Sequence, residues 1–194
     1  MAVEFEIKFR ATPEQQADLL KDLSGEKRQY KMQTTYYDTP DGDLSARKYT
    51  LRRRMENERS VCTLKTPAKG LGRNEYELEC DTIEKAIPRL CELSGLPELP
   101  GLLAKGVIPS CGAAFQRTAI TAERPDCTLE IALDKGVLTG GGREKPLCEI
   151  EVELKSGTQE AAKTYAKMLQ LAYGLTPEKR SKVQRARALA RGEE

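Results

Sequence analysis

The residues best suited to chemistry stand at the start of the chain, in the segment Glu4-Phe5-Glu6-Ile7-Lys8. A β-strand points alternate side chains to opposite faces, so Glu4, Glu6 and Lys8 would share a charged face opposite an apolar one. Carboxylates serve as general acids, general bases and hard metal ligands, and lysine attracts anions. Taken alone, such a face also fits simple exposure to water, so its meaning depends on the rest of the chain.

The composition excludes several kinds of catalysis. The 194 residues include no histidine and no tryptophan. Without histidine the chain has no Ser-His or Cys-His pair and lacks the commonest nitrogen ligand for metals. The six cysteines form no CxxC pair and no zinc spacing, and most fall on apolar strand faces, where a reduced cysteine acts as a small hydrophobe. Any catalysis must use carboxylates, Lys, Arg, Tyr, Cys or a metal held by oxygen atoms.

The overall charge gives no sign of a nucleic-acid partner. The chain carries 32 basic and 30 acidic residues, a net charge of +2, so no uniform positive field surrounds it. No segment approaches the roughly 18 consecutive apolar residues of a membrane span, and the chain starts in a charged strand with no signal peptide. We therefore expect a cytoplasmic protein with no membrane partner and no nucleic-acid partner.

The elements that would position the charged groups follow from periodicity and turn residues. Strands are expected at residues 4–10, 33–39, 49–55, 61–66, 75–80, 113–121, 127–134 and 147–155. Helices are expected at residues 12–23, 82–93, 158–173 and 178–191. Pro88 should kink or divide the second helix, residues 95–112 give no clear pattern, and Gly140-Gly141-Gly142 should lie in a longer connection. Strands mostly in hairpin order, with helices between and after them, indicate an α+β fold with an antiparallel sheet.

Nearly every expected strand has one charged face, and these charges come in blocks of one sign. The acidic blocks are Glu75, Glu77 and Glu79; Glu130 and Asp134; and Glu149, Glu151 and Glu153. The basic groups are Arg52 and Arg54, Lys65, and Arg117. Like charges beside one another are unfavourable on a surface sheet, whereas a closed barrel can turn such faces inward as opposing walls.

We therefore expect one domain, residues 1–194, built as an eight-stranded antiparallel β-barrel around a charged, water-filled tunnel. The helices, including the C-terminal ones at about residues 158–191, should pack outside the barrel. An antiparallel sandwich with its charged faces in solvent is the alternative.

A charged tunnel of this kind implies ligands, because desolvation and repulsion make it costly as pure structure. Carboxylate clusters without His or Cys suit Mg²⁺ or Mn²⁺. Arginine matches phosphate oxygens with two parallel hydrogen bonds, and lysine supplies a point charge. A metal and a phosphate in one cavity indicate phosphoryl transfer or hydrolysis.

The same residues resemble the signature of the CYTH (adenylate cyclase–thiamine triphosphatase) superfamily, also called triphosphate tunnel metalloenzymes. The ExExK motif at residues 4–8 is followed in family order by further motifs. These are Thr35-Tyr36-Tyr37-Asp38-Thr39-Pro40, Leu51-Arg52-Arg53-Arg54, Thr63-Leu64-Lys65, Arg73-Asn74-Glu75-Tyr76-Glu77, Arg117, Leu133-Asp134-Lys135-Gly136, Cys148-Glu149-Ile150-Glu151 and Ser181-Lys182. The resemblance runs from residue 3 to about residue 190 and implies a triphosphate-binding tunnel that requires Mg²⁺ or Mn²⁺.

The resemblance also implies roles for individual residues. The implied metal ligands are Glu4, Glu6, Asp134, Glu149 and Glu151. The implied phosphate-binding residues are Lys8, Arg52, Arg54, Lys65, Arg117 and Lys182. Catalysis would fall to Glu4, Glu6 and Lys8, with Lys8 orienting water or phosphate. Glu75, Glu77, Glu130 and Glu153 are supporting candidates on the same inward faces, although Glu153 and Glu79, at strand ends, also fit rim charges; Tyr37 and Asp38 are expected to support the tunnel mouth.

Within the superfamily, residues 148–157 most resemble bacterial members that hydrolyse inorganic triphosphate. The expected reaction is metal-dependent hydrolysis of tripolyphosphate to pyrophosphate and phosphate. The alternatives are a nucleoside or thiamine triphosphatase, a class IV adenylate cyclase, and a non-catalytic module that binds polyphosphate or a nucleotide. The chain shows no aromatic platform for stacking a base, which disfavours nucleotides. We expect a stand-alone form without a CHAD domain, a monomer or weak homodimer whose partner is a triphosphate-containing small molecule.

Overall fold

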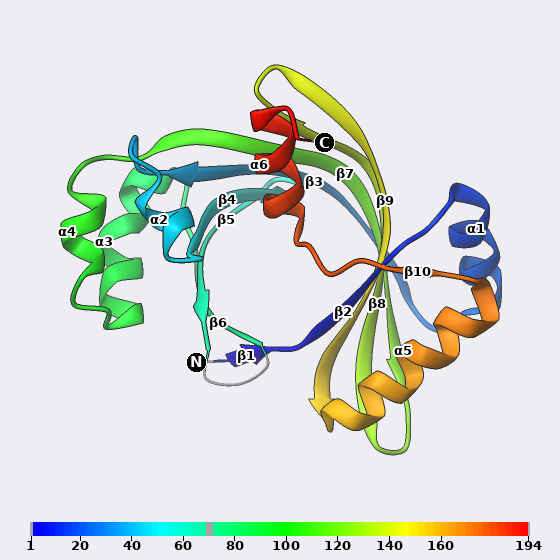
Figure 1. Ribbon diagram of the computed structural model, residues 1–194. Helices are drawn as coiled ribbons and strands as arrows, with labels where there is room; N and C mark the ends of the chain where they lie inside the picture. Colours follow the sequence, from blue (N-terminus) through cyan, green and yellow to red (C-terminus); the bar gives the residue numbers. More distant parts are fainter. Residues whose placement is uncertain (1, 69–71, 194) are drawn as a thin grey trace.

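The computed structural model describes residues 2–68 and 72–193, with side chains described from Phe5 onward. Its centre is a single long, curved antiparallel sheet (Figure 1). In the described residues the sheet has ten strands in the order β1-β6-β5-β4-β3-β7-β8-β9-β2-β10. The strands are β1 (Ala2–Glu4), β2 (Glu6–Arg10), β3 (Lys27–Asp38), β4 (Thr50–Glu56), β5 (Arg59–Pro67), β6 (Arg73–Glu79), β7 (Ile108–Glu123), β8 (Cys127–Gly140), β9 (Arg143–Gly157) and β10 (Thr176–Pro177).

The α+β class and the antiparallel sheet are confirmed, but the closed eight-stranded barrel is wrong. The ladder is open, with β1 at one edge and the two-residue strand β10 at the other. The expected first strand is interrupted at Phe5, before which the chain pairs with β6 and after which it pairs with β9. The two ends of the sheet are therefore joined by the chain itself and not by a continuous set of hydrogen bonds.

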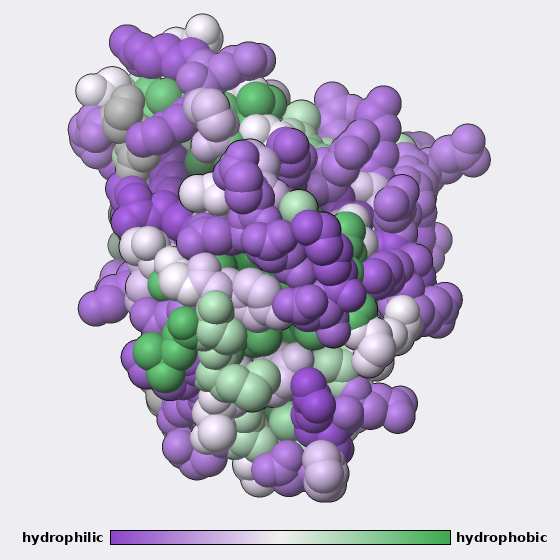
Figure 2. Space-filling model, turned by 90° about the vertical axis from the view of Figure 1, so that its right-hand side faces the viewer, coloured by the Kyte–Doolittle hydropathy of each residue, from purple (hydrophilic) through white to green (hydrophobic). Residues whose placement is uncertain are grey.

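Helices α1 (Pro13–Asp22) and α5 (Gln159–Tyr173) cover the convex side of the sheet at its β2–β8–β9 end (Figure 1). They bury the apolar faces of these strands in a core that includes Phe9, Ile131 and Val152. Figure 2 views this face, which is largely hydrophilic with apolar patches in its lower half; exposed Met168 and Leu171 lie on α5.

Helices α2 (Asp43–Ala46), α3 (Ile83–Ser94) and α4 (Leu99–Leu103) cover the convex side at the β4–β5–β6 end (Figure 1). A second core forms here, in which Leu51 and Leu64 of the sheet pack with Leu90 of α3. None of the described helices combines the length and the apolar composition needed to cross a lipid bilayer.

Helix α6 (Lys182–Arg191) departs from the expectation that all C-terminal helices pack outside. It lies on the concave side of the sheet (Figure 1), where Ala186 and Leu189 pack against Phe115, Leu138 and Leu147. Strand β10, paired to the free edge of β2, carries the chain from the convex side to the concave side. The helix begins at residue 182 and not at 178, because Ser181 and Gln184 form a capping box there.

Three local expectations also change. Residues 83–94 form one helix despite Pro88, because the hydrogen bond lost at a proline is outweighed here by burial of Ile83, Ala86 and Leu90. Gly141 and Gly142 form a tight hairpin between β8 and β9 and not a longer connection, and both have positive φ values of 58° and 72°. The sheet strands are longer than expected at most ends; β7, for example, starts inside the unassigned region, at Ile108.

Candidate metal and phosphate site

Three carboxylates meet on the concave face of β8 and β9. Asp134 and Glu149 are direct cross-strand partners, and Glu151 follows Glu149 by two residues on the same face. Asp134 and Glu149 are fully buried, and Glu151 is 9% exposed. One oxygen from each lies within 4.8 Å of the others. Strand alternation thus brings Asp134, Glu149 and Glu151 into one group, here called the carboxylate cluster.

Three cationic side chains contact the carboxylate cluster. Lys182 Nζ, at the start of α6, lies 2.7 Å from Asp134 Oδ2 and 2.8 Å from Glu151 Oε1, and it also pairs with Glu149. Arg117 of β7 donates to both oxygens of Asp134 at 2.7 Å, and to Glu151 Oε2 at 2.5 Å. Arg185, one turn after Lys182, pairs with Glu149. The three cations balance three charges that would otherwise be buried together.

The environment shifts the pKa values of this cluster in opposite directions. Burial raises the pKa of Glu149, and Lys182 only partly offsets that increase. Burial also acts to raise the pKa of Glu151, but Lys182 and Arg117 hold it well below its usual range. Burial would lower the pKa of Lys182, yet Asp134 and Glu151 hold it well above its usual value. Glu151 and Lys182 therefore remain a charged pair across ordinary pH.

A group of cations lies on the concave face of β4 and β5. Here we define the basic group as Arg52, Arg54 and Lys65. Arg52 and Lys65 both approach Glu75 Oε1 of β6, at 3.5 Å and 3.3 Å. Arg54 pairs with Glu56, and among the described residues its buried Nε has no hydrogen-bond partner. Burial and the charge of Arg52 lower the pKa of Arg54, as expected where positive charge is concentrated.

The carboxylate cluster and the basic group lie close enough to influence the same side chains. Tyr36 of β3 is 4% exposed, and burial raises its pKa while the charges of Arg52 and Lys182 oppose the increase. The charge of Arg117 likewise contributes to the lowered pKa of Arg54. Tyr36 therefore lies near Arg52 of the basic group and near Lys182, which contacts the carboxylate cluster.

The ExExK motif divides between the two ends of the sheet. Lys8 is the cross-strand partner of Glu151, and its charge helps to lower the pKa of Glu151. Lys8 Nζ bonds Glu6 Oε1 at 2.9 Å, and Glu6 faces Glu153 outside the carboxylate cluster. The backbone of Glu4 pairs with Arg73 at the far end of the sheet, and its side chain lies outside the described part of the structure.

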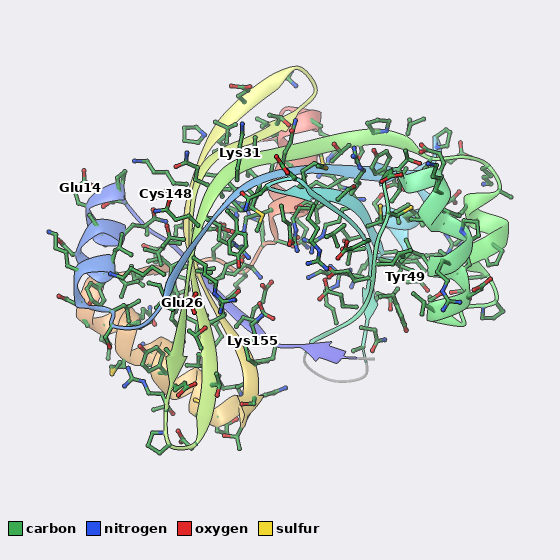
Figure 3. The ribbon with its side chains drawn as sticks, turned by 180° about the vertical axis from the view of Figure 1, so that it is seen from behind. Glu14, Glu26, Lys31, Tyr49, Cys148 and Lys155 are labelled. Atoms are coloured by element: carbon green, nitrogen blue, oxygen red, sulfur yellow. The ribbon has the colours of Figure 1, made fainter. Side chains whose placement is uncertain are left out.

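The four supporting candidates lie around this surface. Glu77 accepts a hydrogen bond of 3.1 Å from Thr63, while Glu75 bridges two members of the basic group. Glu130 and Glu153 are partners across β8 and β9 and share Lys155, at 3.8 Å and 2.8 Å. Lys155 lies on the inner side of the curved sheet (Figure 3), so this pair marks the rim beyond the cluster.

Two contacts of the site escaped the sequence reasoning. Arg185 follows Lys182 by three residues, which places both on one face of a helix, so helical spacing could have identified it. Asp38 accepts backbone hydrogen bonds from Thr39, Leu44 and Ser45 and pairs with Arg187 of α6 at 3.2 Å. Nothing in the sequence identifies Arg187 as its partner, because the contact depends on α6 lying inside the curve.

The donor set of the carboxylate cluster fits a hard divalent cation. It offers oxygen atoms only, from three buried and closely grouped carboxylates, which are the ligands that Mg²⁺ and Mn²⁺ prefer. Lys182 and Arg117 contact the same carboxylates, so a metal ion and these side chains compete for their oxygens. The neighbouring basic group offers guanidinium and ammonium donors suited to phosphate.

Comparison with known proteins identifies the class. Residues 2–186 match the CYTH domain, and the chain belongs to this family. Over 165 residues it is 36% identical to an inorganic triphosphatase of Haemophilus influenzae, an alignment that covers 81% of this chain. The chain spans only 46% of the length of that relative.

Solved structures support the same fold. A Hippeastrum adenylyl cyclase candidate, described as having a dominant triphosphatase activity, superposes with a TM-score of 0.66 at 19% identity, covering 100% of this chain and 97% of its own. A Pyrococcus horikoshii protein gives a TM-score of 0.64 at 22% identity, with 93% and 96% coverage. At these identities the structures establish the shared architecture.

Proposed function

We propose that this protein hydrolyses inorganic triphosphate to pyrophosphate and phosphate in a metal-dependent reaction. The observation that carries the proposal is the pairing of a buried carboxylate cluster with a basic group on one concave face. The first suits a divalent cation and the second suits the oxygens of a polyanion. The 36% identity to a Haemophilus inorganic triphosphatase favours triphosphate among the polyanions.

In this proposal Asp134, Glu149 and Glu151 would hold Mg²⁺ or Mn²⁺, and Glu4 and Glu6 of the first two strands are further candidate ligands. The bound metal would neutralise phosphate charge and make a water molecule more acidic. Arg52, Arg54 and Lys65 bind phosphate oxygens, and Arg117 and Lys182 bind where the two groups meet. Lys8, opposite Glu151, orients the water or the terminal phosphate. The water oxygen bonds to the terminal phosphorus while the bridging P–O bond breaks, the electron pair of that bond leaves with pyrophosphate, and the proton lost by the water passes to the pyrophosphate oxygen.

The first test is phosphate release from tripolyphosphate, ATP, thiamine triphosphate and long-chain polyphosphate, each with and without Mg²⁺ or Mn²⁺. We expect tripolyphosphate to be hydrolysed fastest, and only with metal. Formation of cyclic AMP from ATP would instead indicate a cyclase. If no substrate released phosphate with either metal, the protein would be a binding module and the hydrolase proposal would fail.

The carboxylate cluster is tested by Glu151→Gln. Residues that merely support metal ligands typically contribute about 10- to 100-fold to activity, so loss of a ligand should lower kcat by more than about 100-fold. The matched control is Glu79→Gln, because Glu79 is an exposed strand-end carboxylate that pairs with Arg59. Comparable losses in the two variants would remove the carboxylate cluster from the mechanism.

We further infer that residues 1–194 form one domain and that the protein works in the cytoplasm as a monomer or weak homodimer. All six cysteines are free, as is usual where thiols are kept reduced. Light scattering coupled to size-exclusion chromatography measures the oligomeric state directly.

A further inference from the structure

One buried polar side chain lies on the convex side, behind the carboxylate cluster. Helix α1 buries only Gln16 and Leu19 among its described residues, one turn apart on the face toward the sheet. Leu19 joins the apolar core, but Gln16, at 7% exposure, brings an amide into it. A buried amide is costly unless it is hydrogen-bonded, so its contacts require an explanation.

Both contacts of the Gln16 amide fall on the strands of the carboxylate cluster. Gln16 Nε2 donates to the backbone oxygen of Asp134 at 3.0 Å and to that of Glu149 at 2.8 Å. These two residues are directly paired across β8 and β9, and their side chains point to the opposite, concave face. One side chain therefore links the backbones of two members of the cluster.

The location makes this link important for geometry. The β2–β9 ladder ends at the pair Arg10–Glu149, and the chain then turns into α1 with Ala11 N donating to Cys148 O at 3.1 Å. Glu14 of α1 and Cys148 of β9 mark this junction in Figure 3. The Asp134–Glu149 rung lies inside the β8–β9 ladder, which fixes its register. Past the last β2–β9 pair, α1 contacts the convex side of this rung through the two Gln16 hydrogen bonds.

We propose that Gln16 is a positioning residue that fixes the orientation of the Asp134–Glu149 rung, and with it the spacing of the two carboxylates, for divalent metal binding. This rests on the proposed function only in taking the carboxylate cluster as the metal site. Gln16 acts through the backbone, because its hydrogen bonds hold the main-chain positions from which the Asp134 and Glu149 side chains project. In this proposal it touches neither metal nor substrate. Residues of this kind typically change metal affinity or activity by about 10- to 100-fold when replaced.

The test is Gln16→Met, which keeps the side-chain length but removes both donors. We expect the dissociation constant for Mn²⁺, measured by calorimetry on the folded protein without substrate, to rise by about 10- to 100-fold. The Mg²⁺ concentration for half-maximal hydrolysis should rise in parallel, with kcat at saturating metal close to that of the wild type. Gln16→Asn, whose shorter amide cannot span both oxygens, should weaken Mn²⁺ binding less and serves if Gln16→Met does not fold.

The matched control is Leu19→Ala, which opens the same helix–sheet contact without touching a hydrogen bond to the cluster. It should lower the melting temperature and leave Mn²⁺ affinity within about twofold, given that it removes only apolar packing. Unchanged Mn²⁺ affinity in both Gln16 variants, or equal weakening in Leu19→Ala, would overturn the positioning role. If the wild type bound Mn²⁺ but hydrolysed nothing, and Gln16→Met still weakened binding, the proposed function would fail while this inference stood.

Discussion

Three consecutive arginines of β4 show how strand alternation gives neighbours different surroundings. Arg52 and Arg54 lie on the concave face, beside Glu75 and Glu56. Arg53 points to the convex face, where its Nε donates to Ser60 Oγ at 2.9 Å. The three side chains have the same chemistry, so only their direction distinguishes them.

This contrast supplies a matched pair of variants. Arg54→Ala should raise the KM for tripolyphosphate about 10- to 100-fold, since hydrogen bonds to charged groups contribute about 1.5–3 kcal/mol. Arg53→Ala should leave KM within about twofold, because its guanidinium faces away from the site. Steady-state kinetics at saturating Mg²⁺ measures both. Equal effects would mean that the concave face of β4 does not bind substrate.

Among the secondary-structure elements, α6 links the end of the chain to its first strands. The segment that leads into α6 is held against β2 by Glu178. The backbone N–H of Glu178 donates to Lys8 O at 2.9 Å, and its carboxylate accepts from Arg180 N–H at 2.9 Å. The capping box at Ser181 then starts the helix, and the first turn delivers Lys182 and Arg185 to the carboxylate cluster. Helix α6 is therefore part of the site as well as of the fold.

Removal of the central cation of this helix should destabilise the metal-free protein. Lys182→Ala leaves buried carboxylates with less compensation, and loss of one partner from a buried ion pair costs about 3–5 kcal/mol. Urea denaturation in buffer with chelator should show this decrease in unfolding free energy, and added Mn²⁺ should restore part of it. Lys179→Ala, three residues earlier and exposed, is the control and should change stability little. A small effect of Lys182→Ala would argue against tight ion pairing in the cluster.

Strand alternation, which needs only local order, predicted the acidic and basic strand faces, and the family resemblance supplied the grouping of their residues into metal ligands and phosphate-binding residues. Glu149 and Glu151 share a face by alternation alone, whereas Asp134 joins them through the register of the β8–β9 hairpin, and Arg117 meets Asp134 through the β7–β8 hairpin. The change of partner at Phe5 could not be predicted, because it depends on how far the whole sheet curves. The roles of the basic residues of α6 other than Lys182, and of Gln16, were also not predicted, because both depend on the three-dimensional arrangement. The basic residues of α6 looked like an ordinary solvated face, and Gln16 is one glutamine in an amphipathic helix.

At the scale of the whole molecule, the ladders differ greatly in length. The β8–β9 ladder extends from Cys127 to Gly140, whereas β1 meets β6 over Ala2–Glu4 alone. Short, peripheral pairings open locally at much lower free energy than central strands.

Native-state hydrogen exchange should reveal this difference. The amide of Val3, and those amides of residues 73–75 that face β1 and not β5, should exchange faster than those at the centre of β8 and β9, since few contacts must break to expose them. Exchange followed by mass spectrometry at neutral pH measures both regions in one experiment. Equal protection of the two regions would contradict a weak pairing of β1 with β6.

Under the proposed function, the interruption at Phe5 has a consequence for how a long polyanion would reach the concave face. Separation of β1 from β6 breaks one short ladder and leaves the pairing of β2 with β9 intact. An internal part of a polyphosphate chain could then enter between β1 and β6, so the polymer would not need to enter end first. Discrimination between tripolyphosphate and longer chains would have to arise where the terminal phosphate meets the carboxylates, and not from the width of an opening.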